Sequence, residues 1–214
     1  MSKYPRTYHL PWSKGSTSDD KMLKNCNNFL NKEIVISEKM DGSNVCLEHE
    51  NLFARSHSKL PNHPSFNALK AIHASLKDKI NPNHQIFGEW LFAKHSISYS
   101  DLPSYLMVFG IRDVEKDIFI SFDSIVKICN QLNLNMVPIV FDGVIKTEKE
   151  LKQKTFISQK SIYGDLEGYV IRCKHEFSSA DFSENVAKNV RANHVDPNND
   201  HWIHNEIIKN KLKI

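Results

Sequence analysis

The segment spanning residues 37–44, Ser-Glu-Lys-Met-Asp-Gly-Ser-Asn, restricts what this chain can fold into more than any other segment. An apolar run at 34–36 precedes it and an alternating run at 44–48 follows it, which predicts two strands. The Asp-Gly pair between them indicates a turn, because Gly adopts backbone angles that other residues resist and Asp can bond its own turn. Lys39 is therefore expected at the end of a buried strand, beside a tight turn.

A lysine in that position has a chemical use that a surface lysine lacks. With an ordinary pKa of about 10.4, nearly every lysine is protonated at neutral pH and has no free lone pair. Burial and neighbouring cations lower that pKa to roughly 7–8, and the amine then attacks carbonyl or phosphoryl centres covalently. Lys39 is therefore a candidate nucleophile. The alternative is a surface lysine in an ordinary hairpin turn.

Composition sets the broad class of the protein. The 214 residues are 40% hydrophobic and 25% charged, as in a soluble globular protein, and the net charge of +3 permits a polyanionic partner without requiring one. We expect neither a signal peptide nor a membrane span, since no apolar run approaches the roughly 20 residues that a span needs. The cysteines at 26, 46, 129 and 173 show no C-x-x-C spacing. They predict reduced core thiols and a cytoplasmic location.

The remaining pattern predicts a single α+β domain over residues 1–214, with mostly antiparallel sheets and flanking helices. Residues 1–30 are expected to be irregular, with Trp12 attaching them to the body, and residues 196–214 to end in a helix. Strands are predicted at 52–56, 85–92, 105–113, 117–122, 136–141 and 166–174, and helices at 65–79 and 125–132, the second capped by Ser121 or Asp123. Residues 146–160 are lysine-rich, which suggests a solvated helix and loop or, alternatively, an RNA contact.

Residues suited to chemistry recur in a fixed order along these predicted strands. Glu89 interrupts an apolar run, where an unpaired carboxylate is costly, so it should have a partner or a function. The whole order is Lys39-x-Asp41-Gly42-x-Asn44, Arg55, Gly88-Glu89, Phe109, Glu167-Gly168 and Lys188. This set resembles the covalent nucleotidyltransferase superfamily of ATP-dependent ligases and capping enzymes. Within it, residues 34–191 resemble the phage-type nick-sealing branch of the ATP-dependent RNA ligases.

The resemblance implies a fold and a reaction. The fold would be one nucleotidyltransferase domain, an ATP-grasp-like ligase adenylylation domain. Lys39 would attack the α-phosphate of ATP, giving a lysyl-adenylate and pyrophosphate, with Mg²⁺ or Mn²⁺ as the metal. AMP would then pass to an RNA 5′-phosphate, and a 3′-hydroxyl would displace it, sealing the strand. An RNA repair role, on nicked duplexes and beside an end-processing kinase or phosphatase, would follow.

The resemblance also assigns roles to matching positions. Glu89 would contact the ribose and Phe109 would stack on adenine, and such stacking is worth about 1–3 kcal/mol; for Phe109 the alternative is core packing. Glu167 would hold the metal, because Mg²⁺ needs only one or two carboxylates besides phosphates and water. Lys188 would contact phosphate and lower the pKa of Lys39. Arg55 would bind phosphate oxygens. The remaining nucleotide-binding positions implied are Glu38, Asp41, Gly42, Asn44 and Arg191.

The chain departs from the family pattern in two places. The last element usually carries two lysines one residue apart, whereas Val190 holds the second position here and Arg191 follows. Whether Arg191 substitutes is open, because a shift of one residue turns a strand side chain to the other face. We also expect no separate OB or C-terminal accessory domain. The basic segment 202–214 would then grip RNA as a helix, or its apolar residues would close the core.

Other functions fit parts of the same pattern. A minimal DNA ligase or a capping-type guanylyltransferase would use the same lysine with another polynucleotide or nucleotide. A catalytically inactive RNA-binding relative would keep the fold without the chemistry. The presence of Lys39, Glu89, Glu167 and Lys188 together argues against that last alternative, because a binding module has no need for a desolvated lysine.

Overall fold

The computed structural model describes residues 3–54, 61–157, 160–192 and 207–213. Its strands are β1 (Tyr8–His9), β2 (Glu33–Lys39), β3 (Ser43–Leu47), β4 (Leu52–Ala54), β5 (His84–Trp90), β6 (Leu106–Asp113), β7 (Ile118–Phe119), β8 (Asn135–Met136), β9 (Ile139–Val144), β10 (Gly168–Cys173), β11 (Phe177–Ser178) and β12 (Val186–Val190). Its α-helices are α1 (Asn67–Leu76), α2 (Phe122–Leu132), α3 (Glu148–Lys154) and α4 (Phe182–Asn185), and short 3₁₀ turns cover 27–29, 64–66, 77–79 and 179–181.

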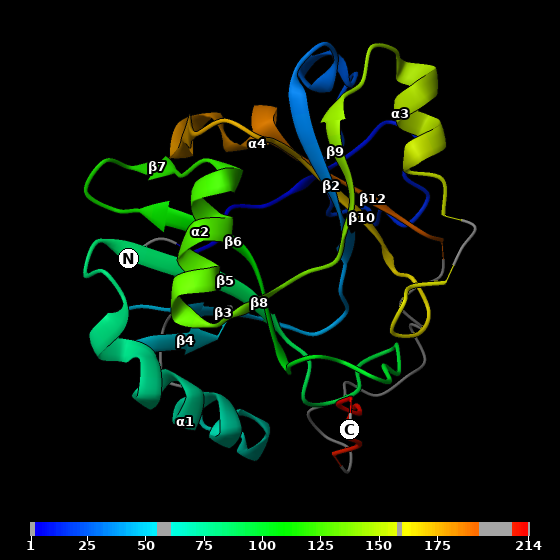
Figure 1. The fold of residues 1–214 in the computed structure, drawn as a ribbon. Helices are drawn as coiled ribbons and strands as arrows, with labels where there is room; N and C mark the ends of the chain where they lie inside the picture. Colours follow the sequence, from blue (N-terminus) through cyan, green and yellow to red (C-terminus); the bar gives the residue numbers. More distant parts are fainter. Residues whose placement is uncertain (1–2, 55–60, 158–159, 193–206, 214) are drawn as a thin grey trace.

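These strands form two sheets (Figure 1). One has the order β1-β12-β10-β2-β9, and the other has the order β11-β7-β6-β5-β3-β4 with β8 paired to β6. The pairs are antiparallel except β1 with β12 and β6 with β8. The predicted α+β class with mostly antiparallel sheets is confirmed. In the described parts of the chain, no helix has the length and apolar character needed to cross a membrane.

Helices α1 and α2 cover the outer face of the seven-stranded sheet (Figure 1). Helix α2 begins as predicted, with the Ser121 hydroxyl accepting a hydrogen bond from the Ser124 amide at 3.3 Å. Three of its four buried residues, Ile125, Cys129 and Leu132, recur at helical spacing and pack on the sheet. Among the described residues this face forms the largest apolar cluster, and it holds both helices on the seven-stranded sheet.

The space between the sheets is filled at one end by an aromatic cluster. Phe87 of β5 and Phe119 of β7 come from one sheet, and Phe182 of α4 precedes β12 of the other. The ring of Tyr4 lies among them, with its centroid 5.0 Å from those of Phe87 and Phe182. Aromatic pairs add packing energy beyond the area they bury. This cluster therefore joins the two sheets.

The N-terminal segment covers the outer face of the five-stranded sheet, together with α3. Its irregular backbone still contributes core residues, because Leu10, Cys26 and Phe29 are fully buried there. Trp12 is half-buried and its Nε1 donates to the Thr155 hydroxyl at 3.3 Å, so the predicted attachment is confirmed. The four cysteines are buried and carry free thiols, also as predicted.

The predicted C-terminal helix is wrong over the described residues 207–213. Residues 207–213 contain no helix and instead form isolated bridges, Ala93 with Lys209 and Leu102 with Leu212. Their backbone groups bond to the loop at 91–102 rather than to one another, which removes the i to i−4 bonds that a helix requires. Residues 196–206, including Trp202 and Ile203, lie outside the described residues.

Candidate active site

Lys39 ends β2, which lies between β10 and β9 in the five-stranded sheet. Ile34 and Ile36 of β2 point into the core beneath the N-terminal segment. Because side chains alternate along a strand, Lys39 faces the opposite way, towards the second sheet. Lys188 of β12 shares that face, since both it and Ser37 pair with Val170 across β10. Two predicted site lysines therefore project from one sheet face.

The seven-stranded sheet contributes acidic and aromatic groups to the same space. Asn44 of β3 pairs with Glu89 of β5, so the two side chains share a face. The neighbouring residues Val45 and Trp90 belong to the core under the helices, which leaves Asn44 and Glu89 facing the other sheet. Glu89, the predicted ribose contact, therefore faces the same space as Lys39, the candidate nucleophile.

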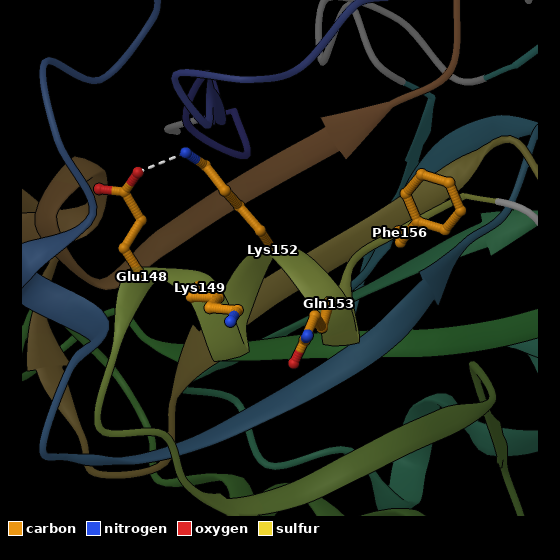
Figure 2. A pocket seen from close by; sticks show the side chains of 5 residues that line it. All are labelled: Glu148, Lys149, Lys152, Gln153 and Phe156. Atoms are coloured by element: carbon orange, nitrogen blue, oxygen red, sulfur yellow. Dashed lines mark ion pairs between the residues drawn. The ribbon is translucent and has the colours of Figure 1, made fainter.

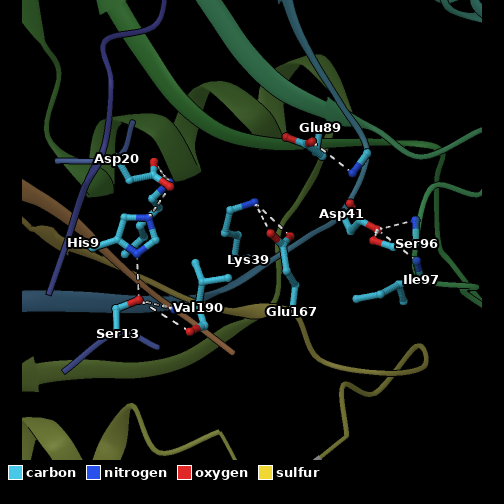
Figure 3. A network of polar contacts seen from close by, with 12 residues as sticks. His9, Ser13, Asp20, Lys39, Asp41, Glu89, Ser96, Ile97, Glu167 and Val190 are labelled. Carbon is cyan, nitrogen blue, oxygen red and sulfur yellow. Dashed lines mark hydrogen bonds and ion pairs between the residues drawn. The ribbon is translucent and has the colours of Figure 1, made fainter. Parts of the chain in front are cut away.

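Lys39 forms an ion pair with Glu167, the residue just before β10. Its Nζ lies 2.8 Å from both carboxylate oxygens, and Figure 3 shows the two side chains pointing at one another. Gly168 pairs with Lys39 in the ladder, and this register puts Glu167 at the level of the lysine. The Lys39 side chain is 28% exposed and that of Glu167 only 4%. Solvent or a substrate can therefore reach the ion pair at the Lys39 side chain, whereas the Glu167 side chain is covered.

The pKa of Lys39 moves in the direction opposite to the prediction. Burial alone lowers it, but the negative charges of Glu167, Glu89 and Asp41 outweigh burial and raise it above its ordinary value. The expected lowering by burial and cations is therefore wrong for this arrangement of residues, because three carboxylates act on the ammonium. Lys39 is held as a charged partner of Glu167.

Glu89 is poised differently from Glu167. Burial raises the pKa of Glu89 to about 8, with Glu167 and Asp41 adding to the rise and Lys39 opposing it. One of its oxygens accepts a hydrogen bond from the Gly42 amide at 3.1 Å. Gly42 must be glycine for this contact, because a Cβ there would lie 2.7 Å from the Trp90 carbonyl oxygen. The Asp-Gly turn and the Glu89 strand are therefore packed directly against each other.

Asp41 serves the loop that follows β5. Its Oδ2 accepts hydrogen bonds from the Ser96 amide at 2.9 Å, the Ser96 hydroxyl at 2.6 Å and the Ile97 amide at 2.9 Å (Figure 3). Its own amide donates to the Tyr99 hydroxyl at 2.8 Å. These bonds hold the turn after Lys39 in place. The sequence predicted Asp41 in the site but did not indicate these partners.

Lys188 has an acidic partner that the sequence reasoning missed. Its Nζ lies 3.3 Å from one carboxylate oxygen of Asp20. The other Asp20 oxygen lies 3.3 Å from the buried His9 ring (Figure 3). Burial lowers the pKa of Lys188, and the charge of Lys39 adds to this while Asp20 opposes it. Asp20 comes from a polar loop with no periodic pattern. The sequence marks Asp20 only as part of a polar turn that contains two aspartates, and this pattern does not indicate that Lys188 is its partner.

Phe109 lies at an irregularity in β6. Phe87 pairs with Gly110 and Gly88 with Val108, so Phe109 is the extra residue of a bulge. A bulge redirects a side chain, and bulges are frequent beside functional sites. The ring is half-buried and meets Tyr4 edge to face, with centroids 5.0 Å apart. Phe109 thus packs against the aromatic cluster and also against the apolar cluster that contains Met40, the residue after Lys39. These contacts are compatible with both core packing and stacking on a base.

The other predicted site residues are less closely grouped. The Glu38 side chain lies on the opposite face of β2 from Lys39, where it is buried and accepts a hydrogen bond from the Ser161 hydroxyl. Arg191 follows β12, its amide donates to the Glu167 carbonyl oxygen at 3.0 Å, and its Nε has no hydrogen-bond partner in the described structure. Val190 is buried beneath Gly15. Arg55 lies outside the described residues.

The site offers few protein ligands for a metal ion, which suits a cation that binds mainly water and substrate oxygens. Across the described ranges, no cluster of three or more His, Cys, Asp or Glu side chains could enclose a metal ion. Glu167, a residue that is 3% exposed, offers a carboxylate that lies against Lys39, and Mg²⁺ or Mn²⁺ would complete its shell with water and substrate phosphates. The residues therefore fit a substrate-bridged cation rather than a structural metal.

A surface pocket on α3 does not belong to this site. Glu148, Lys149, Lys152, Gln153 and Phe156 line it. Figure 2 shows the ion pair between Glu148 and Lys152 on one side of the helix and Lys149 on the other. Helix α3 packs through Leu151 on the outer core, across the sheet from Lys39. Nothing here resembles a catalytic arrangement, and the lysines fit a solvated surface.

Sequence comparison identifies the class. The profile of the RNA ligase family matches residues 32–190, which is most of the chain and includes every site residue described above except Asp20, His9 and Arg191. The protein belongs to the RNA ligase family. A comparison with curated protein sequences finds no significant match.

Solved structures with the same fold come from an RNA ligase of Naegleria gruberi. A glutamate-to-alanine variant with AMP and Mn gives a TM-score of 0.54 at 13% identity, covering 89% of this chain and 56% of that one. A lysine-to-methionine variant with AMP and Mn gives 0.54 at 14% identity, covering 87% and 60%. A lysine-to-alanine variant with ATP and Mn gives 0.52 at 13% identity, covering 89% and 61%. The chain therefore spans less than two thirds of the length of each of these structures.

Proposed function

We propose that this protein is an ATP-dependent RNA ligase that carries AMP on Lys39. The observation that supports this best is the convergence of Lys39, Lys188, Glu89 and Glu167 in the space between the two sheets. A lysine held by a carboxylate beside a second cation is suited to attack on a phosphoryl centre and to neutralising the charge that develops there.

The reaction would proceed in three steps. Lys39 Nζ, after losing a proton, forms a bond to the α-phosphorus of ATP while the bond to pyrophosphate breaks. An oxygen of an RNA 5′-phosphate then attacks the same phosphorus and releases Lys39, leaving AMP joined to the RNA end. A 3′-hydroxyl finally attacks the RNA 5′-phosphorus, forming the phosphodiester and releasing AMP.

The residues of the site have distinct tasks in the first step. Lys188 would offset charge on the phosphate, and Glu89 would accept a ribose hydroxyl. The ion pair with Glu167 places Lys39 but also favours its ammonium form. Deprotonation is thus the step the site must assist. A divalent cation held by Glu167 would supply positive charge beside Lys39, and such charge lowers the pKa of an amine.

The test is covalent labelling of the protein. The purified chain is incubated with α-labelled ATP and Mg²⁺ or Mn²⁺, denatured, and examined for acid-labile label. Wild-type protein should retain label, whereas Lys39→Ala and Lys39→Arg should retain none, because neither residue offers a neutral amine. Lys24→Ala, which removes an exposed lysine, is the matched control and should label normally. Label on either Lys39 variant would exclude Lys39 as the nucleophile.

The same assays with other nucleotides and polynucleotides distinguish the RNA ligase from the alternative functions. Labelling by GTP in preference to ATP would favour a guanylyltransferase, and sealing of nicked DNA in preference to nicked RNA would favour a DNA ligase. A chain that binds RNA without labelling would be an inactive relative. RNA substrates should carry a 5′-phosphate and a 3′-hydroxyl at the break.

A further inference from the structure

The C-terminal strap, defined here as residues 207–213, is bound to the loop at 91–102. The Lys94 amide donates to the Ile208 carbonyl oxygen at 2.7 Å, and the Lys211 amide donates to that of Tyr99 at 3.0 Å. Leu102 closes the contact, since its amide donates to the Lys211 carbonyl oxygen at 3.0 Å. Segments more than a hundred residues apart in the sequence are thereby paired.

Asn210 lies at the centre of the strap and is 2% exposed. Its Oδ1 accepts from the Tyr99 amide at 2.8 Å, and its Nδ2 donates to the Leu91 carbonyl oxygen at 2.7 Å and that of Ala93 at 3.4 Å. Both ends of the amide are thus occupied by backbone groups of one loop. Truncation of the Asn210 side chain would leave buried polar groups of that loop unpaired, which is unfavourable.

The same loop reaches the turn after Lys39. The Tyr99 hydroxyl accepts the Asp41 amide at 2.8 Å, and Ser96 and Ile97 bond the Asp41 carboxylate. The residue after Asp41, Gly42, donates to Glu89. A continuous series of hydrogen bonds therefore runs from Asn210 through Tyr99 to the backbone between the nucleophile and the acid.

We propose that Asn210 is a positioning residue for adenylylation: by fixing Tyr99, it holds the Asp41 amide and so sets the position of Lys39 relative to Glu89. This inference rests on the proposed function. It differs from a purely structural role, in which Asn210 would stabilise the fold without affecting the geometry around Lys39. Because rates respond steeply to small displacements of a reacting group, a loosened turn should lower the rate of labelling at saturating ATP.

Three variants separate the two roles. Asn210→Ala removes the anchor, and Tyr99→Phe removes only the hydroxyl that accepts the Asp41 amide. Tyr105→Phe is the matched control, because its hydroxyl donates only to the backbone carbonyl oxygen of Asn210, at 3.0 Å, and leaves the Asn210 side-chain amide that fixes Tyr99 in place. Each full-length variant is assayed for labelling rate against ATP concentration, for melting temperature, and for hydrogen exchange at the Asp41 amide by NMR. The exchange measurement needs no activity.

The expected result is the same for Asn210→Ala and Tyr99→Phe. Exchange at Asp41 should be at least about tenfold faster, and the labelling rate at saturating ATP about tenfold lower with the half-saturating ATP concentration changed less than about threefold. The double variant should label no more slowly than the slower single variant, since both changes interrupt one series of bonds. Tyr105→Phe should keep wild-type exchange and rate.

Several outcomes would overturn the inference. One is an Asp41 amide in Asn210→Ala that exchanges at the wild-type rate. A second is a loss of labelling rate in Tyr105→Phe as large as in the other two variants. A third is a double variant whose loss of labelling rate is the product of the two single losses. If Asn210→Ala does not fold, Tyr99→Phe with unchanged exchange or rate overturns it alone. Absence of label on the wild-type protein would instead refute the proposed function, and the two failures are therefore distinguishable.

Discussion

Replacing Asp20 by Asn tests the electrostatic attachment of the N-terminal segment to β12. Partial burial acts to raise the pKa of Asp20, but hydrogen bonds from Thr17 and the charges of Lys188 and His9 outweigh it and lower the pKa from 3.8 to about 2. At about 1.36 kcal/mol per unit, that difference corresponds to roughly 2.5 kcal/mol of native-state stability at neutral pH. The substitution should therefore lower the free energy of unfolding by about 2 kcal/mol at pH 7.

The sign of the pH dependence follows from the lowered pKa. The unfolded chain binds the Asp20 proton near pH 4 and the folded chain near pH 2, so this contribution is complete above about pH 5 and is lost as the pH falls towards 2. About half of it should be gone by pH 3. The stability gap between wild type and Asp20→Asn should narrow accordingly.

Urea denaturation of both proteins at pH 7, 4 and 3 measures that gap directly. Asp19→Asn is the control, since the neighbouring carboxylate is exposed and its removal should change stability by less than about 0.5 kcal/mol. A gap below about 0.5 kcal/mol at pH 7, or one that stays constant down to pH 3, would refute the reasoning.

Three further predictions follow from the site. Glu167→Ala should lower the labelling rate at least about tenfold, with partial recovery at high Mn²⁺ concentration. If this variant labels at the wild-type rate at low metal concentration, Glu167 does not bind the metal. Gly42→Ala should destabilise the fold by about 1–3 kcal/mol, because its Cβ would meet the Trp90 oxygen at 2.7 Å and the Leu91 side chain at 2.8 Å, as thermal melting can check. Deletion of residues 207–214 should abolish labelling and nick sealing together and lower the melting temperature; loss of sealing alone, with labelling intact, would instead favour a strap that grips RNA.

The local patterns of the sequence determined the framework of the fold. Alternation and apolar runs predicted β2, β3, β5, β6 and β10, and helical spacing with a serine cap predicted α2, because these elements follow from the periodicity of neighbouring residues. The order of Lys39, Glu89, Phe109, Glu167 and Lys188 on those strands indicated the family. That much needed no knowledge of how the sheets face one another.

The tertiary structure alone decided which groups act on one another. Asp20 contacts Lys188 across 168 residues and Asn210 contacts Tyr99 across 111, and neither loop has a periodic pattern that would indicate its partner. The pKa of Lys39 likewise depends on carboxylates from other strands, and their proximity reverses the shift expected from burial. The C-terminal segment was expected to be a helix from the positions of its apolar residues, but the backbone groups of residues 207–213 bond to a loop. Electrostatic interactions and hydrogen bonds depend on distances between atoms. For residues far apart in the sequence, those distances are set by the packing of the whole chain and cannot be derived from local sequence patterns.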